Sequence, residues 1–166
     1  MRKIALQLLL AAFLTLALLP SCNSEMGIDS DGLGDGQGIS FVVGTEQYVF
    51  TENLGAGYTI DDDLTCVVAS DAVGASAENA IHIYFPGNDA DTFTGPPDSS
   101  DLPRIGILLD SLYYTWEDDK GCSFSINVTA YGPVGALIEG TFSGELVDGD
   151  EKIKVTDGVF SVMRHS

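Results

Sequence analysis

Polar and apolar residues alternate strictly along residues 122–131, which read CSFSINVTAY. Cys122, Phe124, Ile126 and Val128 fall on one side of an extended chain, while serine, asparagine and threonine fill the other side. A period of two with one apolar side is typical of a strand whose sheet has one face on the core and one in water. We therefore predict a β-strand here, the clearest in the chain.

Short apolar runs of this kind recur from Ile39 onward, separated by turns rich in glycine, proline and aspartate. In the run AIHIYF the alternation places Ile81 and Ile83 on the core side, and His82 and Tyr84 on the outer side. After residue 22 no segment has sustained helical periodicity; the stretch 69–80 is the only helix candidate and is a poor one.

The last run, EKIKVTDGVFSVMR, changes phase in its middle. Val155 lies on the apolar side before Asp157-Gly158, and Phe160 and Val162 lie on that side only if one residue is extra. We predict a β-bulge at Asp157-Gly158, with Gly158 in the left-handed region. About nine or ten short strands with turns every 8–12 residues predict a single antiparallel β-sandwich or barrel-like domain over residues 39–166.

The apolar run at the start of the chain has another purpose. Residues 4–19 are apolar apart from Gln7 and Thr15, and follow the basic pair Arg2-Lys3. Sixteen residues are short for a membrane span, which needs about 20. A basic head followed by a short apolar core is typical of a secretory signal. A plain signal peptide and a short uncleaved anchor are the alternatives, but neither gives a role to the cysteine that follows.

The stretch Leu19-Pro20-Ser21-Cys22 resembles the lipobox of bacterial lipoproteins. The resemblance implies cleavage before Cys22 and diacylglycerol on its thiol, so that residues 1–21 are a signal peptide and residues 22–38 are a lipidated tether rich in glycine and aspartate. Several acyl chains are needed for lasting attachment to a membrane. Asn23 follows the cysteine, and by the same resemblance the absence of aspartate there favours the outer over the inner membrane of a bacterial envelope.

Composition adds a strong negative charge. The chain has 7 basic and 25 acidic residues, a net charge of −18, and loss of Arg2 and Lys3 with the signal peptide leaves 5 basic residues and a net charge of −20. Such a surface repels nucleic acid and anionic lipid headgroups, so we predict neither as a partner. The expected attachment to the membrane is through the lipid on Cys22 alone.

Two further cysteines, Cys66 and Cys122, are predicted to form a disulfide. An exported chain meets an oxidising compartment, in which paired thiols tend to be oxidised. Cys66 is in phase with Leu64 and Val68, and Cys122 with Phe124, so both are expected on an apolar face. A bridge closing this loop would stabilise the fold by about 4 kcal/mol. Two buried free thiols are the alternative.

The order of features after residue 39 resembles a loose group of small all-β bacterial lipoproteins. The resemblance is carried by the segments IYFPGNDADTFTG, LYYTW, INVTAYGPVGALIEGTFSG and IKVTDGVFSVMR, which together cover most of the mature chain. It implies an all-β fold and export. It assigns no activity and no functional residue.

An aromatic strand and several acidic turns are the candidate ligand sites. Tyr114 and Trp116 share one face of their strand, where they could stack on sugar rings; packing in the core is the favoured alternative, because aromatic side chains bury the most area. Calcium is a weaker hypothesis for Asp29, Asp31 and Asp35 and for the acidic turns 61–63 and 117–119, which lack a full ligand set.

The sequence contains no motif for catalysis, metal binding or a cofactor. We expect a non-enzymatic, membrane-anchored binding module of the envelope whose partner is a protein or a glycan. The alternative is a carbohydrate- or calcium-binding β-sandwich module.

Overall fold

The computed structural model describes residues 36–95, 103–115 and 122–166. The described part of the chain is almost entirely antiparallel β-structure, as predicted, with 11 strands and one short 3₁₀ turn at Gly74–Ser76. The strands are β1 (Gly38–Val43), β2 (Glu46–Phe50), β3 (Gly55–Thr59), β4 (Leu64–Ser70), β5 (Ala80–Pro86), β6 (Thr92–Gly95), β7 (Arg104–Leu109), β8 (Leu112–Thr115), β9 (Phe124–Tyr131), β10 (Leu137–Asp148) and β11 (Glu151–Met163).

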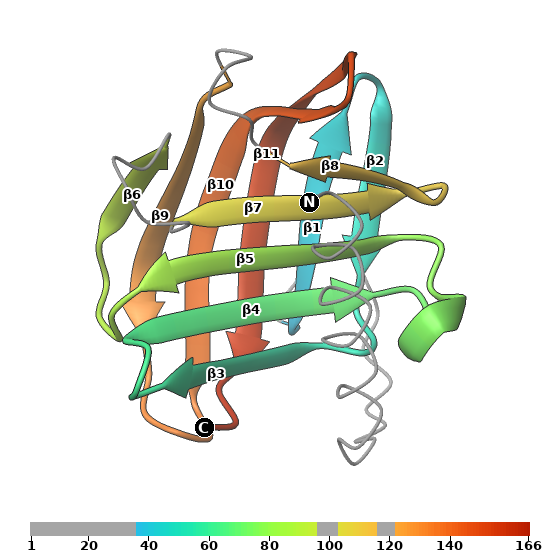
Figure 1. Cartoon of the computed structure of the whole chain (residues 1–166). Coiled ribbons are helices and arrows are strands. Elements are labelled where there is room, and N and C mark those ends of the chain that lie inside the picture. The colour runs from blue at the N-terminus through green and yellow to red at the C-terminus, as the bar shows by residue number, and fades with distance from the viewer. Residues whose placement is uncertain (1–35, 96–102, 116–121) are drawn as a thin grey trace.

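These strands form one curled sheet that folds over itself into two layers (Figure 1). The first layer contains β8, β7, β5, β4 and β3, and the second contains β2, β1, β11, β10, β9 and β6. The strands of the first layer run crosswise over those of the second (Figure 1). The long strand β10 links the layers, because its end pairs with β8 at Val147 and Thr115 while its beginning pairs with β9.

The junction of β10 with β8 is one seam between the layers, and a second seam joins the residues after β11 to β3. Arg164, just beyond β11, forms a parallel bridge with Ala56 of β3, and the His165 backbone N–H donates to the Ala56 carbonyl at 2.8 Å. The Tyr58 N–H donates to the Ser166 carbonyl at 3.1 Å. The arrangement is therefore a barrel-like β-sandwich, in agreement with the predicted fold class.

The core lies between the two layers and is built by the alternation read from the sequence. Ile81, Ile83 and Phe85 of β5 are buried, as are Phe124, Ile126 and Val128 of β9. Aromatic rings of the second layer meet at its centre, where the Phe41 and Phe142 ring centroids lie 5.9 Å apart and those of Phe142 and Phe160 lie 6.4 Å apart. Such tilted ring pairs add to the stabilisation that comes from buried area.

The predicted bulge is present in β11, with one correction. Around Asp157, β11 has one residue more than each of its two neighbours. Ser40 and Val42 of β1 pair with Val159 and Thr156. On the other side, Phe142 and Gly144 of β10 pair with Gly158 and Val155. The extra residue shifts the phase, so that Phe160 and Val162 are fully buried. The prediction of a left-handed Gly158 is wrong: Asp157 has the positive φ, at 53°, in a region that aspartate tolerates better than most residues.

The predicted disulfide is also wrong, because Cys66 and Cys122 are both free. On β4 the core side is occupied by Thr65, Val67 and Ala69, so the strand has the opposite phase from the predicted one and Cys66 faces outward. Cys122 is buried just before β9 in the other layer. A shift of one residue in phase moves every side chain of a strand to the other face, and here it separates the two thiols.

The interior position of Thr65 explains why β4 was misread. Its hydroxyl donates to the Gly87 carbonyl at 2.6 Å and is 2.8 Å from the Tyr131 hydroxyl, so a polar side chain is satisfied inside the core. The apolar Val68 meanwhile faces outward. The alternation of polarity in β4 is thus inverted with respect to burial.

Candidate functional site

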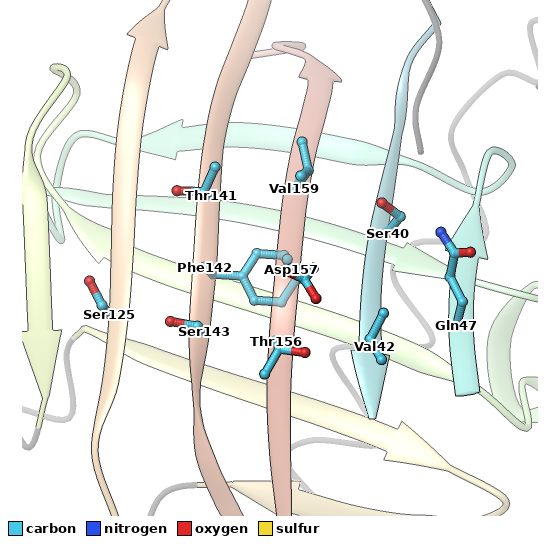
Figure 2. A pocket seen from close by; sticks show the side chains of 11 residues that line it. Ser40, Val42, Gln47, Ser125, Thr141, Phe142, Ser143, Thr156, Asp157 and Val159 are labelled. Atoms are coloured by element: carbon cyan, nitrogen blue, oxygen red, sulfur yellow. The ribbon is translucent and has the colours of Figure 1, made fainter. Parts of the chain in front are cut away.

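A polar hollow of about 670 Å³ lies on the outer face of the second layer (Figure 2). Its volume falls within the range of ligand pockets, roughly 300–1,000 Å³. Five strands contribute side chains or backbone to its lining: β1, β2, β9, β10 and β11. The polar hollow is lined by Ser40, Val42, Gln47, Ser125, Thr141, Phe142, Ser143, Thr156, Asp157, Gly158 and Val159.

The bulge of β11 lies at the centre of the polar hollow. The extra residue turns the exposed Asp157 side chain outward, between Thr156 and Val159 (Figure 2). A β carbon on Gly158 would lie 2.7 Å from the Phe142 ring, so the bare glycine leaves the ring room to pack there. Figure 2 shows that ring between β10 and β11, where it forms part of the floor of the hollow. Bulges are enriched next to functional sites, because they redirect side chains.

Five of the eleven lining residues carry a short hydroxyl side chain. Ser125 of β9 lies directly opposite Ser143 of β10, and Thr141 of β10 lies opposite Val159 of β11. Each hydroxyl can donate one hydrogen bond and accept others, and the Gln47 amide adds both functions. The described lining therefore resembles a hydrogen-bonding surface for a polar, uncharged ligand.

Asp157 is the one ionisable residue among the described lining residues. Hydrolysis of a glycosidic bond by the usual routes needs two facing carboxyl groups, about 5–9.5 Å apart. A serine nucleophile needs a base within hydrogen-bonding reach, and the described lining contains no histidine. The hollow can hold a ligand by hydrogen bonds, and its described residues supply no acid–base pair.

A second polar cluster lies on the outer face of the first layer. Cys66, Tyr84 and Arg104 are cross-strand neighbours on β4, β5 and β7. The Arg104 guanidinium lies 4.5 Å from the centre of the Tyr84 ring, a cation–π contact. The His82 Nδ1 atom is 3.1 Å from the Tyr84 hydroxyl. This set of four residues is called the tyrosine cluster below.

The tyrosine cluster contains no reactive nucleophile at neutral pH. Burial, with a smaller effect of the Arg104 charge, lowers the pKa of His82 to about 4. Burial raises the pKa of the Cys66 thiol to about 11, although a hydrogen bond with Tyr84 opposes this change, and burial also raises the pKa of Tyr84. Because the thiolate is the nucleophilic form of cysteine, Cys66 is inert. The tyrosine cluster therefore consists of three neutral side chains, Cys66, His82 and Tyr84, and the Arg104 cation.

Of the two aromatic residues that the sequence offers for stacking on sugar rings, one is buried and the other lies outside the described residues. Tyr114 is 4 % exposed and packs in the core, which was the favoured alternative. Burial and a hydrogen bond with Glu151 raise the pKa of its phenol to about 12. Trp116 lies outside the described residues, as does Cys22.

Of the acidic turns proposed as calcium sites, only the turn 61–63 lies among the described residues. Asp29, Asp31, Asp35 and residues 117–119 lie outside the described part of the chain. In the turn 61–63, the Asp63 carboxylate accepts a hydrogen bond from the Tyr58 hydroxyl at 2.8 Å, and Asp63 has a φ of 49°. Within residues 36–95, 103–115 and 122–166, no group of three or more histidine, cysteine or acidic residues could hold a metal ion.

The sequence alone does not predict the polar hollow, although it contains two of its features. The outward serine and threonine residues of β9 and the Asp157-Gly158 bulge both follow from the alternation of polar and apolar residues. The hollow forms because five strands lie side by side, in the order β9, β10, β11, β1 and β2. A single sequence does not specify this order. The hollow could therefore be assembled only from the fold.

Comparison with protein-family models, with curated proteins and with solved structures found no match to this chain.

In the part of the chain that the structure describes, no helix is long and apolar enough to cross a membrane.

Proposed function

We propose that this protein is a bacterial lipoprotein, anchored through Cys22, whose β-sandwich is a non-enzymatic binding module that takes its ligand in the polar hollow. The observation that carries the proposal is the hollow itself, an open site lined by hydroxyl, amide and carboxylate groups at a bulge in β11. The lining favours binding over catalysis, because its described residues contain a single carboxylate, with no second carboxylate and no histidine to complete an acid–base pair.

The proposed anchor agrees with the remaining sequence features. The apolar run, the lipobox-like LPSC and the tether that follows are the parts expected of an exported domain held at a membrane. The outer membrane is the proposed location, because Asn23 rather than aspartate follows Cys22. The charge of −20 expected for the mature chain favours solubility of the domain beside the membrane.

The anchor is tested by expressing the full chain and a Cys22→Ser variant in a Gram-negative host. We expect the wild-type chain to sediment with outer membranes and to show an intact mass that begins at residue 22 and includes diacylglycerol and an acyl chain. The Cys22→Ser chain should lack all acyl mass. A wild-type product that begins at Met1, or that carries no acyl group on Cys22, would refute the anchor.

A further inference from the structure

The polar hollow presents mainly side chains to a ligand, because β1, β10 and β11 at its centre are paired on both sides except at the bulge residue Asp157. β1 pairs with β2 and β11, β11 pairs with β1 and β10, and β10 pairs with β11 and β9. A peptide that binds by strand addition needs a free sheet edge, which the middle of this layer does not offer. The ligand must therefore be recognised by the short polar side chains themselves.

Those side chains match a ligand that carries many hydroxyl groups. Ser125, Thr141, Ser143 and Thr156 come from three adjacent strands, and each can donate to one ligand hydroxyl while accepting from another. The Val159 side chain, 39 % exposed, gives the hollow an apolar patch among them. Hydroxyl groups next to apolar C–H surface are the two features that a pyranose ring presents.

Charge selects among ligands of this kind. Asp157 can accept a charge-assisted hydrogen bond from a ligand hydroxyl, which is stronger than a bond between neutral groups. The described lining contains no lysine, arginine or histidine to pair with a ligand anion, and the whole chain carries a net charge of −18. An acidic glycan or a phosphorylated ligand would be repelled.

We infer that the polar hollow binds a neutral saccharide, with Asp157 as its strongest contact. This inference rests on the proposal that the hollow is the ligand site. It assigns carbohydrate binding to the hollow in place of the aromatic strand that contains Tyr114. The saccharide lies across β9, β10 and β11, with its hydroxyl groups on the serine and threonine side chains.

The test uses the full lipidated chain in detergent micelles, applied to an array of neutral and acidic glycans and to a peptide library. We expect retention of neutral glycans only. Hydrogen exchange followed by mass spectrometry, with the best neutral glycan added, should slow over residues 139–145 and 154–160. These two segments contain the parts of β10 and β11 that line the hollow.

Two variants and one control place the contact. Asp157→Asn should weaken binding of the best neutral glycan by about tenfold or more, because a charge-assisted hydrogen bond is lost. Asparagine tolerates positive φ, so the bulge is retained. Thr141→Val, which keeps the shape and removes one hydroxyl, should weaken binding several-fold. Asp89→Asn, an exposed carboxylate outside the lining, should leave affinity unchanged.

The contrary outcomes are distinguishable. If no neutral glycan is retained, and an acidic glycan or a peptide slows exchange in the two segments, the assignment of a neutral saccharide is wrong while the hollow remains the ligand site. If a neutral glycan binds and slows exchange elsewhere, with Asp157→Asn unchanged in affinity, the hollow is not the site and both proposals fail. Retention of no neutral glycan on the array is itself enough to overturn the inference.

Discussion

His82 combines an outward position with burial. Its side chain faces away from the core of the sandwich, between Val68 of β4 and Gly106 of β7, yet is only 6 % exposed. The Tyr113 hydroxyl lies over Gly106, in the place where a β carbon would otherwise stand. Burial of the imidazole, with a smaller effect of the nearby Arg104 charge, therefore keeps His82 in its neutral form at pH 7.

Acid should destabilise the fold through His82. Its pKa is about 4 in the folded state against 6.5 in the unfolded state, so between these values the unfolded chain binds a proton that the folded chain does not. Stability is unaffected above pH 6.5 and falls as pH drops from 6.5 towards 4. Between pH 7 and pH 5 the loss from this residue is about 2 kcal/mol.

Urea unfolding at pH 7 and at pH 5 measures that loss. The matched variant is His82→Gln, which keeps a polar side chain but binds no proton. We expect the wild-type free energy of unfolding to fall by about 2 kcal/mol more than that of the variant between the two pH values. Equal decreases in the two proteins would show that His82 has an unperturbed pKa.

The sequence predicts which side of β5 carries His82, but it does not predict that the side chain is buried there. Alternation placed His82 and Tyr84 correctly on the outer side of β5, but it implied an exposed histidine. Burial on an outer face depends on the neighbours across β4 and β7, which the local pattern does not contain. For Tyr114 the aromatic side chain favoured packing in the core, and its burial confirms that prediction.

At the scale of elements, strands with one polar and one apolar side were predictable and strands with mixed sides were not. β5, β11 and β9 as far as Val128 follow their alternation, and the shift in the phase of β11 was enough to find its bulge. Beyond Val128 the register of β9 shifts, and Tyr131 packs against the core. β4 was inverted, because Thr65 is satisfied inside and Val68 lies outside. The prediction of a disulfide between Cys66 and Cys122 used the wrong phase for β4, and this is why the prediction is wrong.

The segment 164–166 is an element that the sequence pattern did not reveal. It adds to the edge of β3 through the two backbone hydrogen bonds described above. The Arg164 guanidinium lies over the rings of Tyr131 and Tyr58, at 5.1 Å and 6.0 Å from their centres, and donates to the Gly132 carbonyl at 3.3 Å. These contacts fasten the second seam of the barrel-like sandwich.

Deletion of residues 164–166 should therefore open that seam. The deletion removes the two backbone hydrogen bonds to β3, two more between Arg164 and residues 135–136, and the arginine–aromatic contacts. We expect the free energy of unfolding to fall by about 3–5 kcal/mol. The Tyr58 amide, which donates to Ser166, should lose protection from hydrogen exchange. His165→Ala is the matched control, because the exposed His165 contributes through its backbone. A deletion variant as stable as this control would mean that β3 does not need the seam.

At the scale of the whole molecule, the dominant property is self-repulsion. The net charge of −18 is spread over a chain of 166 residues. In the described ion pair Lys152–Glu145, whose charged atoms are 3.2 Å apart, the two side chains are 42 % and 41 % exposed. Exposed pairs of this kind contribute little stability. The uncompensated carboxylates repel one another across the folded surface more than in an expanded chain.

Salt should consequently stabilise the fold. The Debye length falls from about 30 Å at 0.01 M to about 10 Å at 0.1 M ionic strength, which is short enough to screen repulsion between neighbouring turns. We expect the melting temperature to rise by several degrees between 10 mM and 300 mM NaCl. In the variant D61N/D62N/D89N, which removes three exposed carboxylates, the melting temperature should be higher at 10 mM and should rise less with salt. A salt response of equal size in both proteins would show that ions act on the fold by a route other than screening, and a melting temperature that falls with NaCl would contradict the self-repulsion directly.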